Sequence, residues 1–106
     1  MDLSKLKECL GLDQEELAEI LSLFVETTLK DLDALGQAIE AGDPDSVVQC
    51  SHSIKGASAN LGLEEISSAA RAIEMKARRG VLEGAVDGSS FIRDEVVMLR
   101  EAATGS

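Results

Sequence analysis

Apolar residues recur every three or four positions along most of the chain, which is the spacing of one face of an α-helix. The longest such stripe lies between Asp13 and Gly42, and Glu16 is placed to complete a capping box with Asp13. Its buried positions are expected to be Leu17, Leu21, Phe24, Thr28, Leu32, Leu35 and Ile39. We therefore predict one long helix here, with Gly36 as the place where it would bend.

A short helix is predicted before it, with Asp2 as N-cap and Gly11 as the stop. Its apolar face consists of Leu3, Leu6 and Leu10. A third helix is predicted from the cap Asp43, with Pro44 at its first position, to Gly62. Val47, Ile54 and Leu61 mark its buried face, with Cys50, Ala57 and Ser58 between them.

A fourth helix is predicted from Glu64 to Arg79, with Gly80 as its stop. Its inward positions are Ile66, Ala69, Ala70, Ile73 and Ala77. The small residues from Gly84 to Ser90 give no clear pattern, but a last helical stripe follows, ending at residues 104–106, and consists of Ile92, Val96, Leu99 and Ala103. The prediction is an all-α fold, an antiparallel four-helix bundle with a short additional N-terminal helix over one end, forming a single domain over residues 1–106.

Composition supports a helical fold and limits the partners. Only 2% of the 106 residues are aromatic, so Leu, Ile, Val, Ala and Met must fill the core. The net charge of −10 disfavours nucleic acid and anionic membrane surfaces as partners. Residues 50–80 nevertheless carry five basic and three acidic side chains, which favours an acidic partner for this part unless these charges are simply scattered and solvated.

Cys9 and Cys50 have neither the spacing of a metal pair nor the number of a disulfide framework, so both are expected to be reduced. The start of the chain lacks the basic and apolar regions of a targeting segment, and no apolar stretch is long enough to span a bilayer. We therefore expect a cytoplasmic protein.

His52 is the only histidine of the chain, and it lies on the third predicted helix about 200° away from Ile54, so it points outward. Lys55, Gly56 and Ala59 follow on the same helical stripe. A glycine inside a helix costs about 0.5–1 kcal/mol relative to alanine, which suggests that another surface approaches His52 closely here. A neutral imidazole is a nucleophile, repulsion from Lys55 favours the neutral ring, and the ammonium would offset the charge of a transferred phosphoryl group.

Glu74 is a candidate partner of His52, because Gly62 lies ten residues after His52 and twelve before Glu74. An antiparallel hairpin would bring the two side chains to similar height, and a hydrogen bond from the ring to the carboxylate would fix the tautomer. The alternative is an exposed Glu74 paired with Arg71 or Arg78 on its own helix.

The run HSIKGASANLG, residues 52–62, resembles the signature of histidine-containing phosphotransfer (HPt) domains. On this resemblance His52 matches the phospho-accepting histidine, Lys55 and Gly56 match the pair that follows it, Ser58 and Ala59 fall among the small residues, and Leu61-Gly62 match the end. Glu74 corresponds to a family position that is often a Gln or Glu bonded to the histidine. The likeness extends more loosely to about residues 13–80.

The resemblance implies a carrier that takes a phosphoryl group from a receiver-domain aspartate of one response regulator and passes it to another. Response-regulator receiver domains or a sensor histidine kinase are then the expected partners of a monomer, with Ser53, Gly56 and Ala59 at the contact. The chain has no GxxxxGK[ST] loop, so we expect no kinase or ATPase activity of its own. No cofactor is expected, because no carboxylate cluster near His52 suggests a bound Mg²⁺, which the receiver would supply.

Other functions stay open at this point. The domain could belong to a chemotaxis-type or hybrid sensor kinase, or be a docking module that has lost phosphotransfer. A metal-binding bundle is disfavoured because one histidine supplies too few ligands. A Cys50/His52 nucleophile pair is disfavoured because the two residues lie about 200° apart on a helix.

Overall fold

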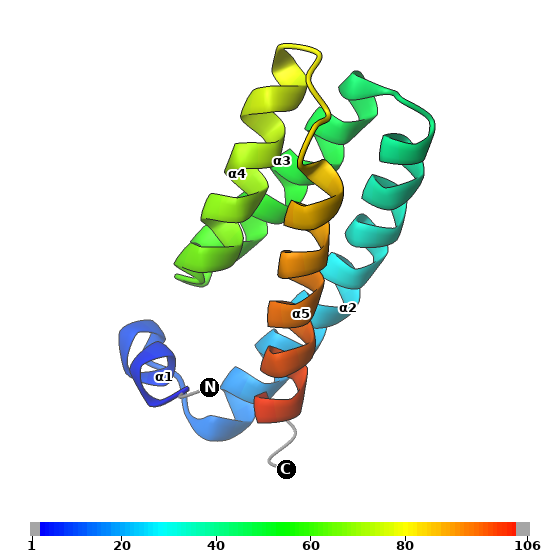
Figure 1. The fold of residues 1–106 in the computed structure, drawn as a ribbon. Helices are drawn as coiled ribbons and strands as arrows, with labels where there is room; N and C mark the ends of the chain where they lie inside the picture. Colours follow the sequence, from blue (N-terminus) through cyan, green and yellow to red (C-terminus); the bar gives the residue numbers. More distant parts are fainter. Residues whose placement is uncertain (1–2, 104–106) are drawn as a thin grey trace.

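The computed structural model describes residues 3–103, and these form five α-helices without a strand. The helices are α1 Ser4–Leu10, α2 Gln14–Glu40, α3 Pro44–Asn60, α4 Glu64–Arg78 and α5 Ala85–Ala103. Helices α2 to α5 run alternately up and down, and each packs against its two neighbours in the ring α2–α3–α4–α5 (Figure 1). The predicted four-helix bundle is therefore confirmed.

The end signals read from the sequence account for most helix boundaries. The Asp13 side chain accepts a hydrogen bond from the backbone of Glu16, and the Glu16 side chain accepts one from the backbone of Asp13, which completes the capping box. The Asp43 side chain caps α3, with Pro44 at its first turn. Gly11, Gly42, Gly62 and Gly80 follow helix ends with positive φ, where a side chain would be strained.

The bounds of two helices differ from the sequence expectations. Helix α4 ends at Arg78, and α5 begins at Ala85, so most of the Gly84–Ser90 segment is helical. Helix α2 is continuous through Gly36. The predicted N-cap Asp2 lies outside the described residues, as do residues 104–106, and Leu3 precedes the first residue of α1 without a side-chain cap.

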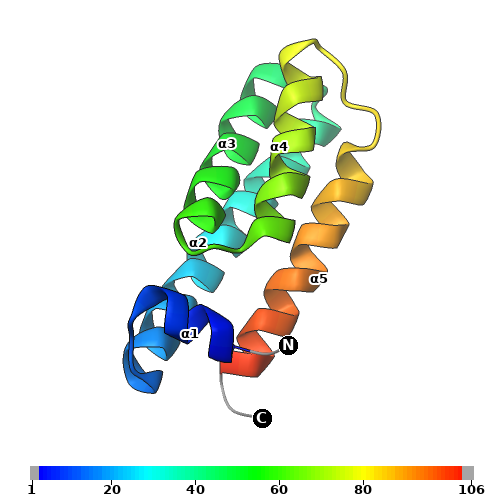
Figure 2. The ribbon, with the colours of Figure 1, turned by 90° about the vertical axis from the view of Figure 1, so that its left-hand side faces the viewer.

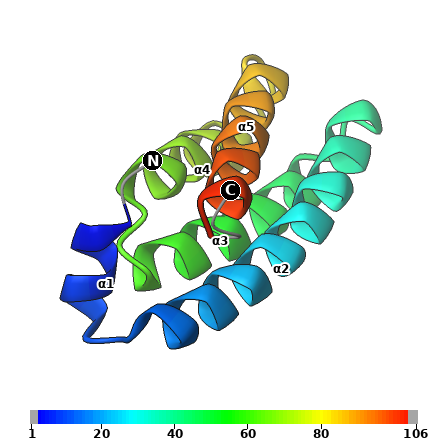
Figure 3. The same cartoon turned by 90° about the horizontal axis from the view of Figure 1, so that it is seen from below.

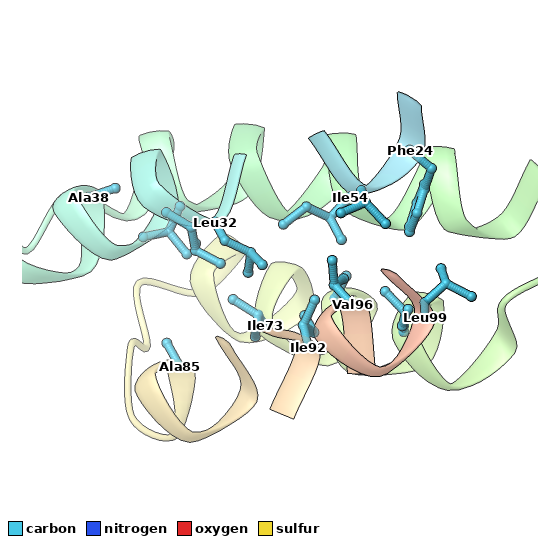
Figure 4. Close-up of a cluster of buried hydrophobic side chains, with 14 of the residues drawn as sticks. Phe24, Leu32, Ala38, Ile54, Ile73, Ala85, Ile92, Val96 and Leu99 are labelled. Atoms are coloured by element: carbon cyan, nitrogen blue, oxygen red, sulfur yellow. The ribbon is translucent and has the colours of Figure 1, made fainter. Parts of the chain in front are cut away.

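The core lies between the four long helices, and Figure 4 shows side chains from all of them meeting there. Leu21, Leu35, Val47, Ile54, Ile92 and Leu99 are fully inaccessible to solvent. Ile39, Leu61, Ala69 and Ala103, which were expected to be buried, lie at its margin and are partly exposed. Apolar periodicity thus found the core-facing side of each helix.

Helix α1 lies across the end of the bundle where α2 begins and where the α3–α4 turn is located (Figures 2 and 3). Its apolar residues Leu3, Leu6 and Leu10 are partly buried against the core. This is the placement expected for the short first helix. It leaves the length of the α3–α4 hairpin uncovered on its outer side.

Candidate functional site

The site is built by the α3–α4 hairpin. Gly62, with a φ of 73°, lies in the short turn between Asn60 and Glu64, so α4 runs back directly beside α3 (Figure 2). Residues equally distant from this turn therefore face each other. The hairpin geometry brings His52 of α3 next to Glu74 of α4.

His52 and Glu74 form a hydrogen-bonded pair whose members differ sharply in exposure. His52 Nδ1 lies 3.1 Å from Glu74 Oε2. The side chain of His52 is 61% exposed, whereas that of Glu74 is 3% exposed. The ring thus stands on the surface while a buried carboxylate holds one of its nitrogens.

Two cations share the same carboxylate. Lys55 Nζ lies 2.8 Å from Glu74 Oε1. Arg78, one helical turn after Glu74, donates from Nη2 and Nε to Oε2 at 2.6 and 3.2 Å. The sequence offered His52 and Arg78 as competing partners of Glu74, but the structure brings both to it.

The contacts keep Glu74 ionised despite its burial. Burial raises the pKa of Glu74, but the contacts with Lys55, Arg78 and His52 outweigh this effect and lower the pKa to about 2. An ionised carboxylate only accepts hydrogen bonds, so His52 must donate from Nδ1. In the neutral ring the lone pair then resides on Nε2, the nitrogen that does not contact Glu74.

Gly56 and Ala59 are exposed, as expected for positions on the outer side of α3. A Cβ built on Gly56 would have no heavy atom within 4 Å beyond its own stretch of helix. Packing against a neighbouring helix therefore does not explain this glycine. Ser53 is exposed too, and its hydroxyl donates to Asp31 Oδ2 of α2 at 2.9 Å.

The two cysteines do not take part in this cluster. Both are free, Cys9 exposed and Cys50 half-buried. Burial and the negative charge of Asp31 raise the pKa of the Cys50 thiol, which disfavours the thiolate that a nucleophile requires. Across residues 3–103, no three His, Cys, Asp or Glu side chains are grouped so that they could hold a metal ion. None of the helices in this range is long and apolar enough to cross a membrane.

The sequence model of the Hpt domain matches residues 19–102. The chain belongs to the Hpt domain family. The match includes the whole α3–α4 hairpin. It therefore includes His52, Lys55, Glu74 and Arg78, which we call the His52 cluster. The resemblance read from residues 52–62 is thereby confirmed.

Two sensor proteins contain a region similar to this Hpt domain. It is 37% identical over 75 residues to the sensor protein EvgS of Escherichia coli (strain K12), and 36% identical over the same length to EvgS of Escherichia coli O157:H7. The match covers 71% of this chain but only 6% of the sensor proteins.

A solved structure shares the whole fold. The crystal structure of histidine-containing phosphotransfer protein B (HptB) from Pseudomonas aeruginosa PAO1 is similar to this Hpt domain with a TM-score of 0.80 and 28% sequence identity. The similarity covers 96% of this chain and 86% of HptB. The short α1 and the four-helix bundle both fall within this extent.

Proposed function

We propose that this chain is a histidine phosphotransfer protein of a two-component phosphorelay, which carries a phosphoryl group on His52 between receiver-domain aspartates. The observation that carries the proposal is the His52–Glu74 pair, in which Nδ1 is bonded to a buried carboxylate on an otherwise exposed ring. Such a bond orients the imidazole and directs the lone pair of Nε2 toward an approaching phosphoryl group.

The chemistry asks little of the carrier beyond position and charge. Nε2 attacks the phosphorus of a phospho-aspartate in line with the bond that breaks, and the aspartate leaves as a carboxylate. Glu74 orients the ring, and Lys55 offsets charge on the phosphoryl oxygens. Gly56, whose outer side is open, allows a receiver to come close, with Ala59 and Ser53 at the edge of the contact.

The proposal extends to partners and setting. Response-regulator receiver domains and sensor histidine kinases are the proposed partners. We further propose that this acidic chain acts as a monomer and contacts neither nucleic acid nor membranes. The chain is proposed to need no cofactor of its own and to have no kinase or ATPase activity, with Mg²⁺ supplied by the receiver. We propose that it acts in the cytoplasm, and the free cysteines and partners of this kind support this.

The test is transfer of label from phosphorylated receiver domains of the source organism to the wild type and to His52→Gln. Wild type is expected to gain acid-labile label, and His52→Gln none, because no other residue of the chain is an imidazole. Far-UV circular dichroism of both proteins controls for folding, since the exposed ring contributes little to the core. Label on the folded His52→Gln protein would contradict the proposal.

A further inference from the structure

The His52 cluster holds more positive charge than its own carboxylate balances. Lys55 and Arg78 both contact Glu74, so these three charged groups carry a net charge of +1 beside the ring of His52. Arg78 keeps 59% of its side chain exposed and Lys55 keeps 29%. Both are long, flexible side chains that can change partners without disturbing the core.

A phosphoryl group brings close to two negative charges and three strong acceptor oxygens at neutral pH. Bonded to Nε2, the phosphoryl group would be attached to the same imidazole ring whose Nδ1 contacts Glu74. It would then compete with Glu74 for both cations, and it offers them more charge and a more solvated position than the buried carboxylate does.

We propose that Lys55 and Arg78 exchange partners during the phosphorylation cycle: they rest on Glu74 and move to the phosphoryl oxygens when His52 is phosphorylated. This inference rests on the proposed function and adds Arg78 as a residue that contacts the phosphoryl group. In the resting state Glu74 contacts both cations, and its hydrogen bond with Nδ1 orients the ring. In the phosphorylated state Glu74 is released from them and faces the ring alone.

The exchange matches the charge changes of the reaction. On acceptance, the lone pair of Nε2 forms the N–P bond, and the electrons of the broken P–O bond stay on the donor carboxylate. Nδ1 keeps its proton, so the ring becomes cationic and the released Glu74 balances it. On onward transfer, the electrons of the N–P bond return to Nε2 and the ring departs as neutral imidazole. A ring that kept its Nδ1 proton is the better leaving group.

The exchange does not involve the other charged groups on α2 and at α4. On α2, Asp31 accepts the hydroxyl of Ser53. On α4, Arg71 is exposed before Glu74, and Arg79 is exposed just after the last residue of the helix. Arg79 therefore offers a matched control for Arg78, with the same chemistry and a neighbouring position.

The direct test follows the arginine side chains by NMR while phosphoramidate, a small phosphoryl donor, phosphorylates the full chain. We expect the Nε–Hε signal of Arg78 to shift as a ³¹P signal of the N–P bond grows, and that of Arg79 to stay in place. An Arg78 signal that does not move while the ³¹P signal grows would overturn the exchange and leave the proposed function intact. Absence of the ³¹P signal would overturn both.

Rates give a second readout. Arg78→Gln is expected to slow phosphorylation by phosphoramidate about two- to fivefold, the range for a partly exposed charge contact, while Arg79→Gln has no such effect. Arg78→Lys should restore most of the rate, and added KCl should narrow the gap between wild type and Arg78→Gln. A gap that salt does not change would assign Arg78 a structural role only and overturn the exchange.

Discussion

Two glycines lie inside helices on opposite sides of α4, Gly56 on α3 and Gly88 on α5 (Figure 2). A Cβ built on Gly88 would stand 3.0 Å from Ile73 Cδ1 and 3.1 Å from Ile73 Cγ1 of α4. A Cβ built on Gly56 would meet nothing within 4 Å outside its own helix. The glycine on the α5 side permits two helices to pack, and the one on the α3 side leaves room for another molecule.

The two sides of α4 differ in chemistry in the same way. Toward α5, Ile73 presents an apolar side chain that fills the space above Gly88. Toward α3, the next residue, Glu74, presents a buried charge in contact with three side chains, those of His52, Lys55 and Arg78. Both sides of the helix pack on the apolar core. The α3 side adds a charge cluster that pH and salt affect, whereas the contact with Gly88 is apolar and hardly responds to either.

Acid should weaken the α3 side of α4 selectively, because it protonates Glu74. The pKa of Glu74 falls from 4.5 to about 2 on folding. Its stabilisation is thus complete above pH 4.5 and is lost as pH falls toward 2. The shift corresponds to about 3 kcal/mol in all, of which about 2 kcal/mol is lost between pH 7 and pH 3.

Urea unfolding at pH 7 and pH 3 measures this loss. Other carboxyls titrate in the same range, so the comparison is with Glu74→Gln, whose free energy of unfolding should fall less between the two pH values. Equal losses in both proteins would show that Glu74 does not carry the effect. The Gly88–Ile73 contact contains no titratable group and should not contribute.

A bulky residue at Gly88 should break the packed side. Gly88→Leu forces a side chain into the contact with Ile73, and overpacking of this kind costs about 1–3 kcal/mol. The rate of phosphoryl transfer per folded molecule should stay near that of the wild type, because Gly88 is on α5 and the His52 cluster is on the α3–α4 hairpin. Thermal unfolding gives the stability, and an unchanged melting temperature would contradict the tight contact.

Most of this arrangement could be predicted from the sequence, because the signals for it lie in short stretches of the chain. Apolar spacing and the caps at Asp13 and Asp43 fixed the helices, and the distances from Gly62 brought His52 and Glu74 together. The start of α5 was missed because its small residues have weak helix propensity, and its packing against α4 decides the outcome.

The full set of contacts at Glu74 also escaped prediction. Pairing with Arg78 was treated as an alternative to the bond with His52, although a carboxylate has lone pairs for several donors. The stripe with His52 singled out Gly56 in the sequence, but no sequence signal assigned Gly88 to helix packing. Whether a mid-helix glycine faces a neighbour or open space depends on how the helices pack.

Gly56→Leu is the matched partner of Gly88→Leu and should act in the opposite way. We expect transfer from a phosphorylated receiver to slow about tenfold, or about 1.4 kcal/mol, because the side chain obstructs approach to His52. The fold should not be weakened, since the added atoms project into open space. Transfer at the wild-type rate would leave Gly56 without a role in docking.

The smallest effect that we expect is on stability alone, and it comes from alanine at each of the two glycines. Gly56→Ala should raise the free energy of unfolding by about 0.5–1 kcal/mol, because alanine loses less backbone entropy in a helix and its methyl group meets no neighbour. Gly88→Ala gains the same entropy but must displace Ile73, so its net change should be smaller or negative. Chemical unfolding of the two variants side by side measures the difference. If Gly88→Ala were the more stabilising of the two, the assignment of one glycine to packing and the other to docking would be wrong.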